Sequence, residues 1–155
     1  MVDDVAAFSG DHPAHRLTVA PTQPRLGALV VRVFGELDAF TAPRLGRVLA
    51  LGIEGVAREA ARAPAPRDGH RPAASTGHQS ATRPVVVCDL DGLEFVGGRG
   101  LWVLEASAAA ATASAVRFVV VAGPQARAVR RAITLTNLDR VVPVRRSLLA
   151  ADLGP

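Results

Sequence analysis

The stretch that decides the fold is Pro84 to Leu101, PVVVCDLDGLEFVGGRGL. It opens with a short continuous apolar run, which is typical of a central strand buried on both faces. A glycine-rich turn, GGRG at 97–100, follows, and helical periodicity begins at Leu101. We therefore predict a strand over 84–89 and a helix over 101–115, and we expect the functional surface at the turn that joins them.

The rest of the chain alternates strand and helix patterns. Leu45, Val48, Leu49, Ile53 and Val56 recur at helical spacing after Thr41 and Pro43, which suit a helix start. Alternating strands and helices predict an α/β domain, with a mixed, mostly parallel sheet of about five strands covered by about four helices. The other expected strands are 16–20, 28–34, 116–122 and 141–144, and the other expected helices run from 41 to 62, from 123 and from 147.

Two segments are expected to lie outside the packed core. Residues 63–83, APAPRDGHRPAASTGHQSATR, contain almost nothing apolar larger than alanine, so we predict a disordered insertion between the first helix and the third strand. Residues 1–13 are expected to form a flexible N-terminal tail. The predicted domain is thus a single unit over 14–155, a length that supports one hydrophobic core.

Composition excludes several classes of function. No apolar run approaches the ~20 residues that span a bilayer, and the N-terminal residues are acidic where an export signal is basic, so we expect a cytoplasmic protein with no membrane span. The single cysteine, Cys88, excludes an internal disulfide and is expected in the core. The four histidines fall in segments expected to be loose, so we predict neither a metal site, a cofactor nor a catalytic residue.

The net charge of +4 gives modest attraction toward acidic partners. All 18 basic residues are arginine, but the chain has one tryptophan, five phenylalanines and no tyrosine. Nucleic-acid binding usually needs a basic stripe interleaved with aromatic residues. We therefore expect no direct contact with nucleic acid.

The segment VVVCDLDG resembles the first motif of the haloacid dehalogenase phosphatases, in which Asp89 would be the nucleophile and Asp91 the acid/base. In that family a threonine usually comes next, where this chain has Leu93, and a basic residue and a distal acidic pair must follow. This chain has no lysine, and only scattered acids follow. We therefore predict no enzyme, and we interpret Asp89 and Asp91 as turn and loop carboxylates beyond the end of the strand.

The GGRG turn admits two interpretations. Glycines at a helix N-terminus let backbone N–H groups approach an anion. The lysine and the spacing of a nucleotide-hydrolysing P-loop are missing. In the other interpretation the glycines only permit a tight turn between strand and helix.

Three ordered segments together resemble the STAS domain, the fold of bacterial anti-sigma factor antagonists. They are GELD at 35–38 followed by TAP at 41–43, the segment from Asp89 to Leu101, and LTNLDRV at 135–141. The resemblance implies a non-catalytic binding module whose loop and second helix dock on a serine-kinase anti-sigma factor. It covers roughly residues 17–153, apart from the insertion.

The resemblance also assigns a regulatory position. The regulated members read Asp-Ser-Ser-Gly at this turn and are phosphorylated on the first serine, so Gly98 takes the phosphoacceptor position and has no hydroxyl to modify. Of the four residues only Gly100 is retained. We therefore expect a module that binds its partner constitutively, or one that has lost kinase control and serves as a scaffold or decoy. The implied partner-binding residues are Gly97, Gly98, Arg99, Gly100, Trp102, Glu36, Asp38 and Thr41.

Other interpretations remain open from the sequence. The indole of Trp102 suits both helix-to-sheet packing and an exposed anchor beside the turn. Arg99 is either a solvated charge or a partner for an acidic group, and Glu36 and Asp38 either brace their loop or contact a partner. Alternative functions are a module that binds a nucleotide or another anion, and a subunit of a larger assembly, stressosome-like or for lipid transport. The oligomeric state is left undetermined.

Overall fold

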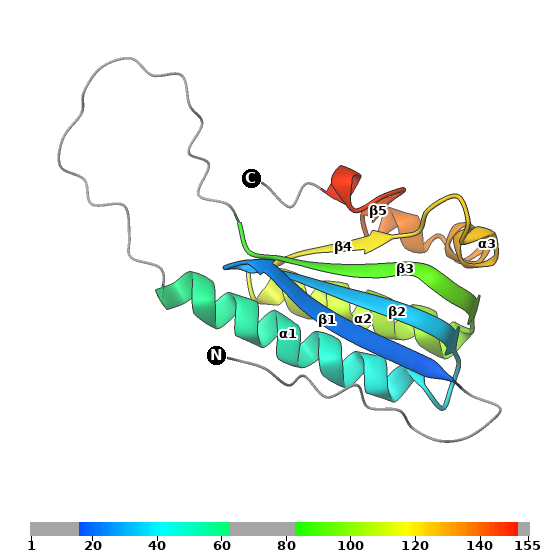
Figure 1. Ribbon diagram of the computed structural model, residues 1–155, viewed down its shortest axis with the longest axis horizontal. Coiled ribbons are helices and arrows are strands. Elements are labelled where there is room, and N and C mark those ends of the chain that lie inside the picture. The colour runs from blue at the N-terminus through cyan, green and yellow to red at the C-terminus, as the bar shows by residue number, and fades with distance from the viewer. Residues whose placement is uncertain (1–15, 63–82, 152–155) are drawn as a thin grey trace, which may run out of the picture.

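Five strands form one sheet in the residues that the computed structural model describes, which are 16–62 and 83–151. Within these ranges three α-helices and two short 3-10 helices complete the fold (Figure 1). The strands are β1 (Leu17–Arg25), β2 (Ala28–Leu37), β3 (Val85–Val96), β4 (Arg117–Val121) and β5 (Val144–Arg145). The helices are α1 (Ala42–Arg62), α2 (Gly98–Ala113), α3 (Arg127–Leu135), η1 (Leu138–Arg140) and η2 (Leu149–Ala151).

The predicted α/β class is confirmed. The spatial order of the strands is β1-β2-β3-β4-β5, with β1 antiparallel to β2 and every other neighbouring pair parallel. The helix expected from residue 147 is only the single 3-10 turn of η2, and the last strand lies at 144–145 rather than 141–144. The tail predicted at 1–13 and nearly all of the insertion predicted at 63–83 lie outside the described residues.

The third strand is longer than the sequence indicated. β3 continues past residue 89 to Val96, so the prediction of Asp89 and Asp91 as carboxylates beyond the strand is wrong. Pairing with β2 persists to Leu37↔Val96, with register shifts between Arg32 and Phe34 and again after Gly35. Such irregularities bend a strand without ending it. The DxDG pattern therefore marks a bent strand rather than a turn.

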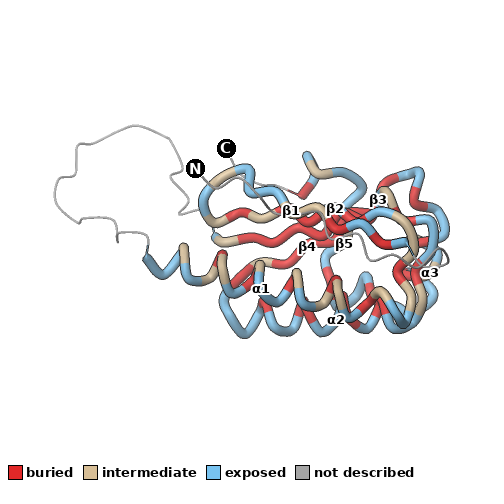
Figure 2. Tube along the Cα trace, turned by 60° about the horizontal axis from the view of Figure 1, so that its bottom comes forward, coloured by how far each residue is buried: buried red, intermediate tan, exposed pale blue. Residues whose placement is uncertain are grey.

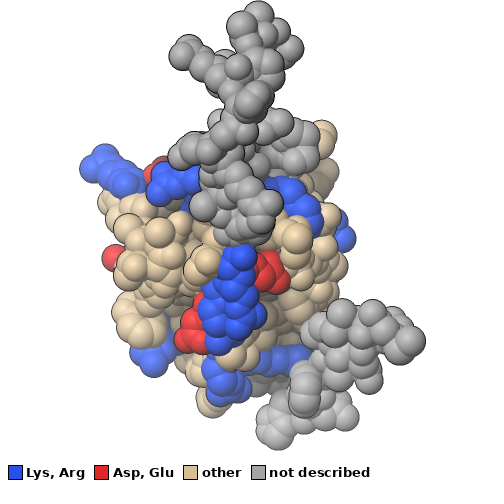
Figure 3. Space-filling model, turned by 90° about the vertical axis from the view of Figure 1, so that its left-hand side faces the viewer, with Lys and Arg blue, Asp and Glu red and all other residues tan. Residues whose placement is uncertain are grey.

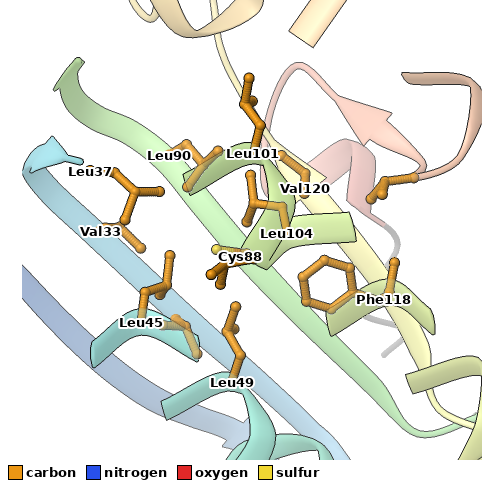
Figure 4. Close-up of a cluster of buried hydrophobic side chains, with 14 of the residues drawn as sticks. Val33, Leu37, Leu45, Leu49, Cys88, Leu90, Leu101, Leu104, Phe118 and Val120 are labelled. Carbon is orange, nitrogen blue, oxygen red and sulfur yellow. The ribbon is translucent and has the colours of Figure 1, made fainter. Parts of the chain in front are cut away.

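The main core lies between the sheet and the helices. The first half of β3 and most of β4 are buried, and the inward side of α1 buries Ala42, Leu45, Leu49, Ile53 and Val56, close to the predicted set (Figure 2). Figure 4 shows side chains from the sheet and helices meeting in this cluster, with Cys88 among them. Cys88 is fully buried, which confirms its predicted place in the core. Burial also raises the pKa of its thiol, which keeps the thiol protonated and unreactive.

A second, smaller apolar cluster occupies the other face of the sheet. Alternate residues of β2, β3 and β4 point to this face because successive side chains of a strand point to opposite sides. Ala151 of η2 is buried there and Leu148 packs against it. The central strands are thus covered on both faces, which explains their continuous apolar runs. The sheet residues of this cluster are Ala28, Val30, Val85, Val87, Val119 and Val121.

The edges of the sheet are short or interrupted. β1 pairs only with β2 and is longer than the predicted 16–20, but it contains Pro21 and Pro24, which carry no N–H to offer to another strand. β5, at the opposite edge, has two residues. Both edges therefore resist pairing with strands of other molecules.

The turn between β1 and β2 is tied to the last part of α1. The Glu59 carboxylate accepts hydrogen bonds from Gln23 Nε2 at 2.8 and 2.9 Å and from the Gly27 N–H at 3.1 Å. These bonds hold the pKa of Glu59 below its usual value. On this end of the molecule some acidic side chains lie among the arginines (Figure 3).

Candidate functional site

The candidate site begins where β3 passes into α2. Gly97 is the N-cap residue of α2, with an extended backbone, and no side chain caps this end of the helix. Its N–H donates to the Leu37 carbonyl at 2.8 Å, and its carbonyl accepts from the Leu101 N–H at 3.1 Å. The carboxyl ends of β2 and β3 are therefore tied together at the turn. The helix begins at Gly98, three residues earlier than predicted.

The glycines of this turn differ in what the fold demands of them. A Cβ on Gly98 would meet no atom within 4 Å, and one on Gly97 would make only ordinary contacts, the shortest 3.4 Å to Phe95. A Cβ on Gly100 would lie 2.6 Å from Leu37 Cγ, and the Leu37 side chain is fully buried. The interpretation that the glycines permit the turn is therefore wrong for Gly97 and Gly98. Only Gly100 is required, and it is required for packing.

Trp102 is an exposed residue rather than a packing residue of the core. Its side chain is 55% exposed, and the guanidinium of Arg99 lies 4.7 Å from the centre of its ring. This cation–π contact holds both side chains on the outer surface of the first turns of α2. Leu101 and Leu104 face the core instead (Figure 4). The structure thus favours the exposed-anchor interpretation of Trp102.

The loop between β2 and α1 is braced by its own polar side chains. Asp38 Oδ1 accepts from the N–H groups of Phe40 at 2.9 Å and Thr41 at 2.8 Å. Thr41 Oγ1 accepts from the Asp38 N–H at 2.9 Å and lies 2.9 Å from the Glu36 carbonyl, to which its hydroxyl can donate. Bracing is therefore confirmed for Asp38. The Thr41 hydroxyl thus bonds back into the loop. The backbone carbonyl of Thr41 accepts a hydrogen bond from the Arg44 N–H in the first turn of α1, at 3.1 Å.

The two predicted segments meet through one residue. Leu37 ends β2 just before the braced loop, pairs with Val96, accepts from Gly97 and packs against Gly100. The structure thus places the loop of Glu36, Asp38 and Thr41 and the turn of residues 97–102 side by side, at the carboxyl ends of β2 and β3.

A groove beside Trp102 adds residues that the sequence did not assign to the site. Its volume is about 210 Å³. One wall comes from α2 and the other from the corner that follows α3, where Asn137 adopts a left-handed conformation, with φ of 55°. That corner is the LTNLDRV segment, which offered the only sequence signal for the second wall. The lining residues are Gly98, Leu101, Trp102, Glu105, Thr136, Asn137, Leu138 and Val141.

Asp89 and Asp91 belong to β3, the strand that leads into the turn at residues 97–100. Asp89 is nearly buried, with its Oδ2 3.8 Å from Arg32 Nε and its Oδ1 accepting from the Asp91 N–H at 3.1 Å. Asp91 in turn accepts from the Gly123 N–H, which joins β3 to the segment after β4. Burial raises the pKa of Asp89, and the charge of Asp91 adds to this, while the hydrogen bond and Arg32 oppose it. These contacts give both acids a structural role.

Replacing Asp89 by asparagine is expected to stabilise the protein at neutral pH. Because the pKa of Asp89 is raised, the folded chain binds the proton more tightly than the unfolded chain does. The free energy of unfolding of the native protein therefore falls as pH rises from the ordinary value of 3.8 through the raised one. Asparagine does not titrate and keeps an acceptor for the Asp91 N–H.

Urea unfolding of both proteins between pH 3 and pH 7 measures this difference. The advantage of Asp89→Asn should grow with pH across that window and vanish at the acid end, where the native carboxyl is protonated. A difference that stays constant with pH would contradict the assignment, because it would not come from the charge on Asp89.

Two further properties bear on the chemistry of the chain. Among residues 16–62 and 83–151, no group of three or more histidine, cysteine or acidic side chains is arranged to hold a metal ion. No helix in these ranges is long and apolar enough to cross a membrane. The candidate site consists of one cation–π pair, a braced loop and a groove, beside the carboxyl ends of the parallel strands β2 and β3.

These features define an α/β domain that presents a surface beside a helix N-terminus, and comparison with known proteins identifies its family. The STAS domain family model matches residues 19–151, so the chain belongs to the STAS domain family. No curated protein matches the chain.

Solved structures show the same fold. An anti-sigma factor antagonist from Mycobacterium paratuberculosis is 28% identical with a TM-score of 0.62, covering 87% of this chain and 90% of that one. The anti-sigma factor antagonist SpoIIAA in its unphosphorylated form is 15% identical with a TM-score of 0.57, covering 86% and 93%. The Bacillus cell fate determinant SpoIIAA in its phosphorylated form is 14% identical with a TM-score of 0.53, covering 86% and 96%.

Proposed function

We propose that this STAS domain is a non-catalytic, cytoplasmic regulator of bacterial transcription, an anti-sigma factor antagonist that binds an anti-sigma factor of the serine-kinase type. The observation that carries the proposal is the exposed Arg99–Trp102 pair at the start of α2. It lies on the turn through which, by the family resemblance, such domains dock. The Mycobacterium paratuberculosis relative, at 28% identity, is an anti-sigma factor antagonist.

The surface has the chemistry of a binding site. Tryptophan and arginine are the residue types most enriched among those that dominate the affinity of protein interfaces. An arginine stacked on an indole keeps its in-plane N–H donors free for a carboxylate. The braced loop of Asp38 and Thr41 lies at the same sheet edge and would extend the contact.

The proposed antagonist differs from regulated relatives in lacking the switch. A phosphate on the first serine of the turn would add about −1.5 to −2 charges beside the docking surface. Gly98 has no hydroxyl to accept it. We therefore propose that binding is constitutive with respect to phosphorylation at this position.

A capture experiment tests the proposed function. The native chain, an Arg99→Glu/Trp102→Ala variant and an Arg47→Glu/Leu51→Ala variant serve as baits in a lysate of the host, and bound proteins are identified by mass spectrometry. Arg47 and Leu51 are exposed residues of α1, so the control makes the same kinds of change, loss of a cation and of an apolar side chain, elsewhere on the surface.

We expect a kinase-type anti-sigma factor to be retained by the native and control baits and to fall at least about tenfold with the Arg99/Trp102 variant. Retention by all three baits would remove the turn from the interface. Absence of any anti-sigma factor on the native bait would reject the proposed partner.

A further inference from the structure

The outer surface of α2 carries its charges in a particular order. Arg99 and Glu105 are the only charged residues of this 16-residue helix, and Trp102 lies between them. All three are exposed and follow each other at intervals of three residues, so they form one surface ridge. Along the ridge the order is cation, aromatic ring, anion.

Neither charge is neutralised by another charged side chain of residues 16–62 and 83–151. In the described ranges neither Arg99 nor Glu105 takes part in an ion pair, and Arg99 contacts the indole of Trp102. Arg99 also lies in the first turn of α2, where the positive end of the helix dipole disfavours a cation. A carboxylate supplied from outside the chain would therefore be attracted to this position.

The ridge is complementary to itself. A two-fold axis through Trp102, perpendicular to the ridge, reverses the order of its residues, so that Arg99 of each copy faces Glu105 of the other. Because a ridge of i, i+3 residues is inclined by about 45° to the helix axis, the two α2 helices then cross steeply. We propose that this face of α2 binds a second copy of the chain, through two reciprocal Arg99–Glu105 pairs around the two indoles.

The surroundings of the ridge leave room for this contact. The groove, about 210 Å³ in volume, is lined by both Trp102 and Glu105, so it can receive the incoming arginine beside an indole and a carboxylate. Gly98, next to the ridge, has no neighbour within 4 Å of its Cβ position, so the surface is open at this point. Stacking on Trp102 and pairing with Glu105 are both favourable for a guanidinium.

The contact is small, which sets its strength. We expect a contact limited to the ridge and the groove rim to bury less than the ~800 Å² per partner of a stable interface. We therefore expect a reversible dimer with a dissociation constant between about 1 µM and about 1 mM. The dimer does not depend on the proposed anti-sigma factor, and because it covers Trp102 the two interactions would compete.

Sedimentation equilibrium of the purified full chain tests the dimer without any partner. Arg99→Glu and Glu105→Arg each place like charges together twice across the axis, and each should weaken self-association at least about tenfold. The double variant R99E/E105R restores both pairs with reversed polarity and should return to within about threefold of the native constant. The double variant R47E/E54R, on the exposed side of α1, is the matched control and should dimerise like the native chain.

The outcomes separate cleanly. Native dimerisation that is lost in both single variants and recovered in the double variant establishes the reciprocal pairs, whatever the capture experiment finds. A native chain that stays monomeric up to about 1 mM overturns the proposal. Dimerisation that all variants share equally, or a double variant that fails to recover, also overturns it, because the contact would then lie elsewhere.

Discussion

Replacing Gly98 by serine is expected to turn a chain that takes up no phosphate at the start of α2 into one that takes up close to one phosphate per molecule. The reagent is the serine-kinase anti-sigma factor of the proposed function, with ATP. The substituted side chain has open space, because no atom lies within 4 Å of the Cβ position. The phosphate would form at a helix N-terminus, whose N–H groups and dipole favour an anion. Intact-mass spectrometry measures the incorporation.

Phosphorylation of the G98S chain should then weaken partner binding by at least about tenfold, since the added charges lie beside Arg99 and Trp102. The matched control is Gly100→Ser, whose Cβ would collide with Leu37, so it should lower the free energy of unfolding by about 1–3 kcal/mol, whereas G98S should stay within about 0.5 kcal/mol of native. A folded G98S chain that binds the kinase yet takes up no phosphate would show that Gly98 is not at the phosphoacceptor position.

Replacing Gly35 by alanine is expected to lower the free energy of unfolding by about 3 kcal/mol or more, a large loss for one added methyl group. Gly35 lies in β2 with φ of +92°, a conformation that L side chains rarely adopt, and its Cβ would collide with the Arg16 carbonyl oxygen. That oxygen is part of the backbone and accepts from the Glu36 N–H at 2.9 Å, so it cannot move aside without breaking the pairing of β1 and β2. Urea unfolding followed by circular dichroism measures the change.

Gly55→Ala is the matched control for this prediction. Gly55 lies inside α1 and has nothing within 4 Å of its Cβ position. Alanine there removes backbone freedom from the unfolded chain and should stabilise the protein by about 0.5–1 kcal/mol. If the two variants shifted stability by similar amounts, the close approach of Arg16 to Gly35 would not be the constraint that the structure indicates.

The sequence predicted those features that follow from local periodicity. The helical spacing of Leu45, Leu49 and Ile53 determined α1 because only one side of that helix is buried. The end of β3 was missed because Asp89 and Asp91 have the composition of a turn, whereas their side-chain hydrogen bonds, one of them to Gly123 beyond β4, let them remain within the strand. Local composition cannot show such tertiary contacts.

The candidate site was predicted to a similar degree. Bracing the loop was one of the two interpretations of Asp38, and Asp38 does brace it, because an aspartate at that spacing bonds to N–H groups only two and three residues away. The exposure of Trp102 could not be decided from its position on the helix alone. The second wall of the groove, which includes Val141, depends on how α3 and the corner after it pack beside α2. The periodicity of either segment does not show that the two segments pack side by side. Whether Glu36, Asp38 and Thr41 contact a partner remains a prediction.

The order of the strands also bears on how the chain acquires its structure. In space the strands follow the same order as in the sequence, from β1 to β5. Each strand that leaves the ribosome can therefore add to the free edge of the strands already made, and none has to insert between two that are already paired. At a synthesis rate of about 5–20 residues per second, β1, β2 and α1 would be complete seconds before β5 is made. During synthesis each new strand thus pairs with the most recently formed strand, and the two-residue β5 is the last to be added.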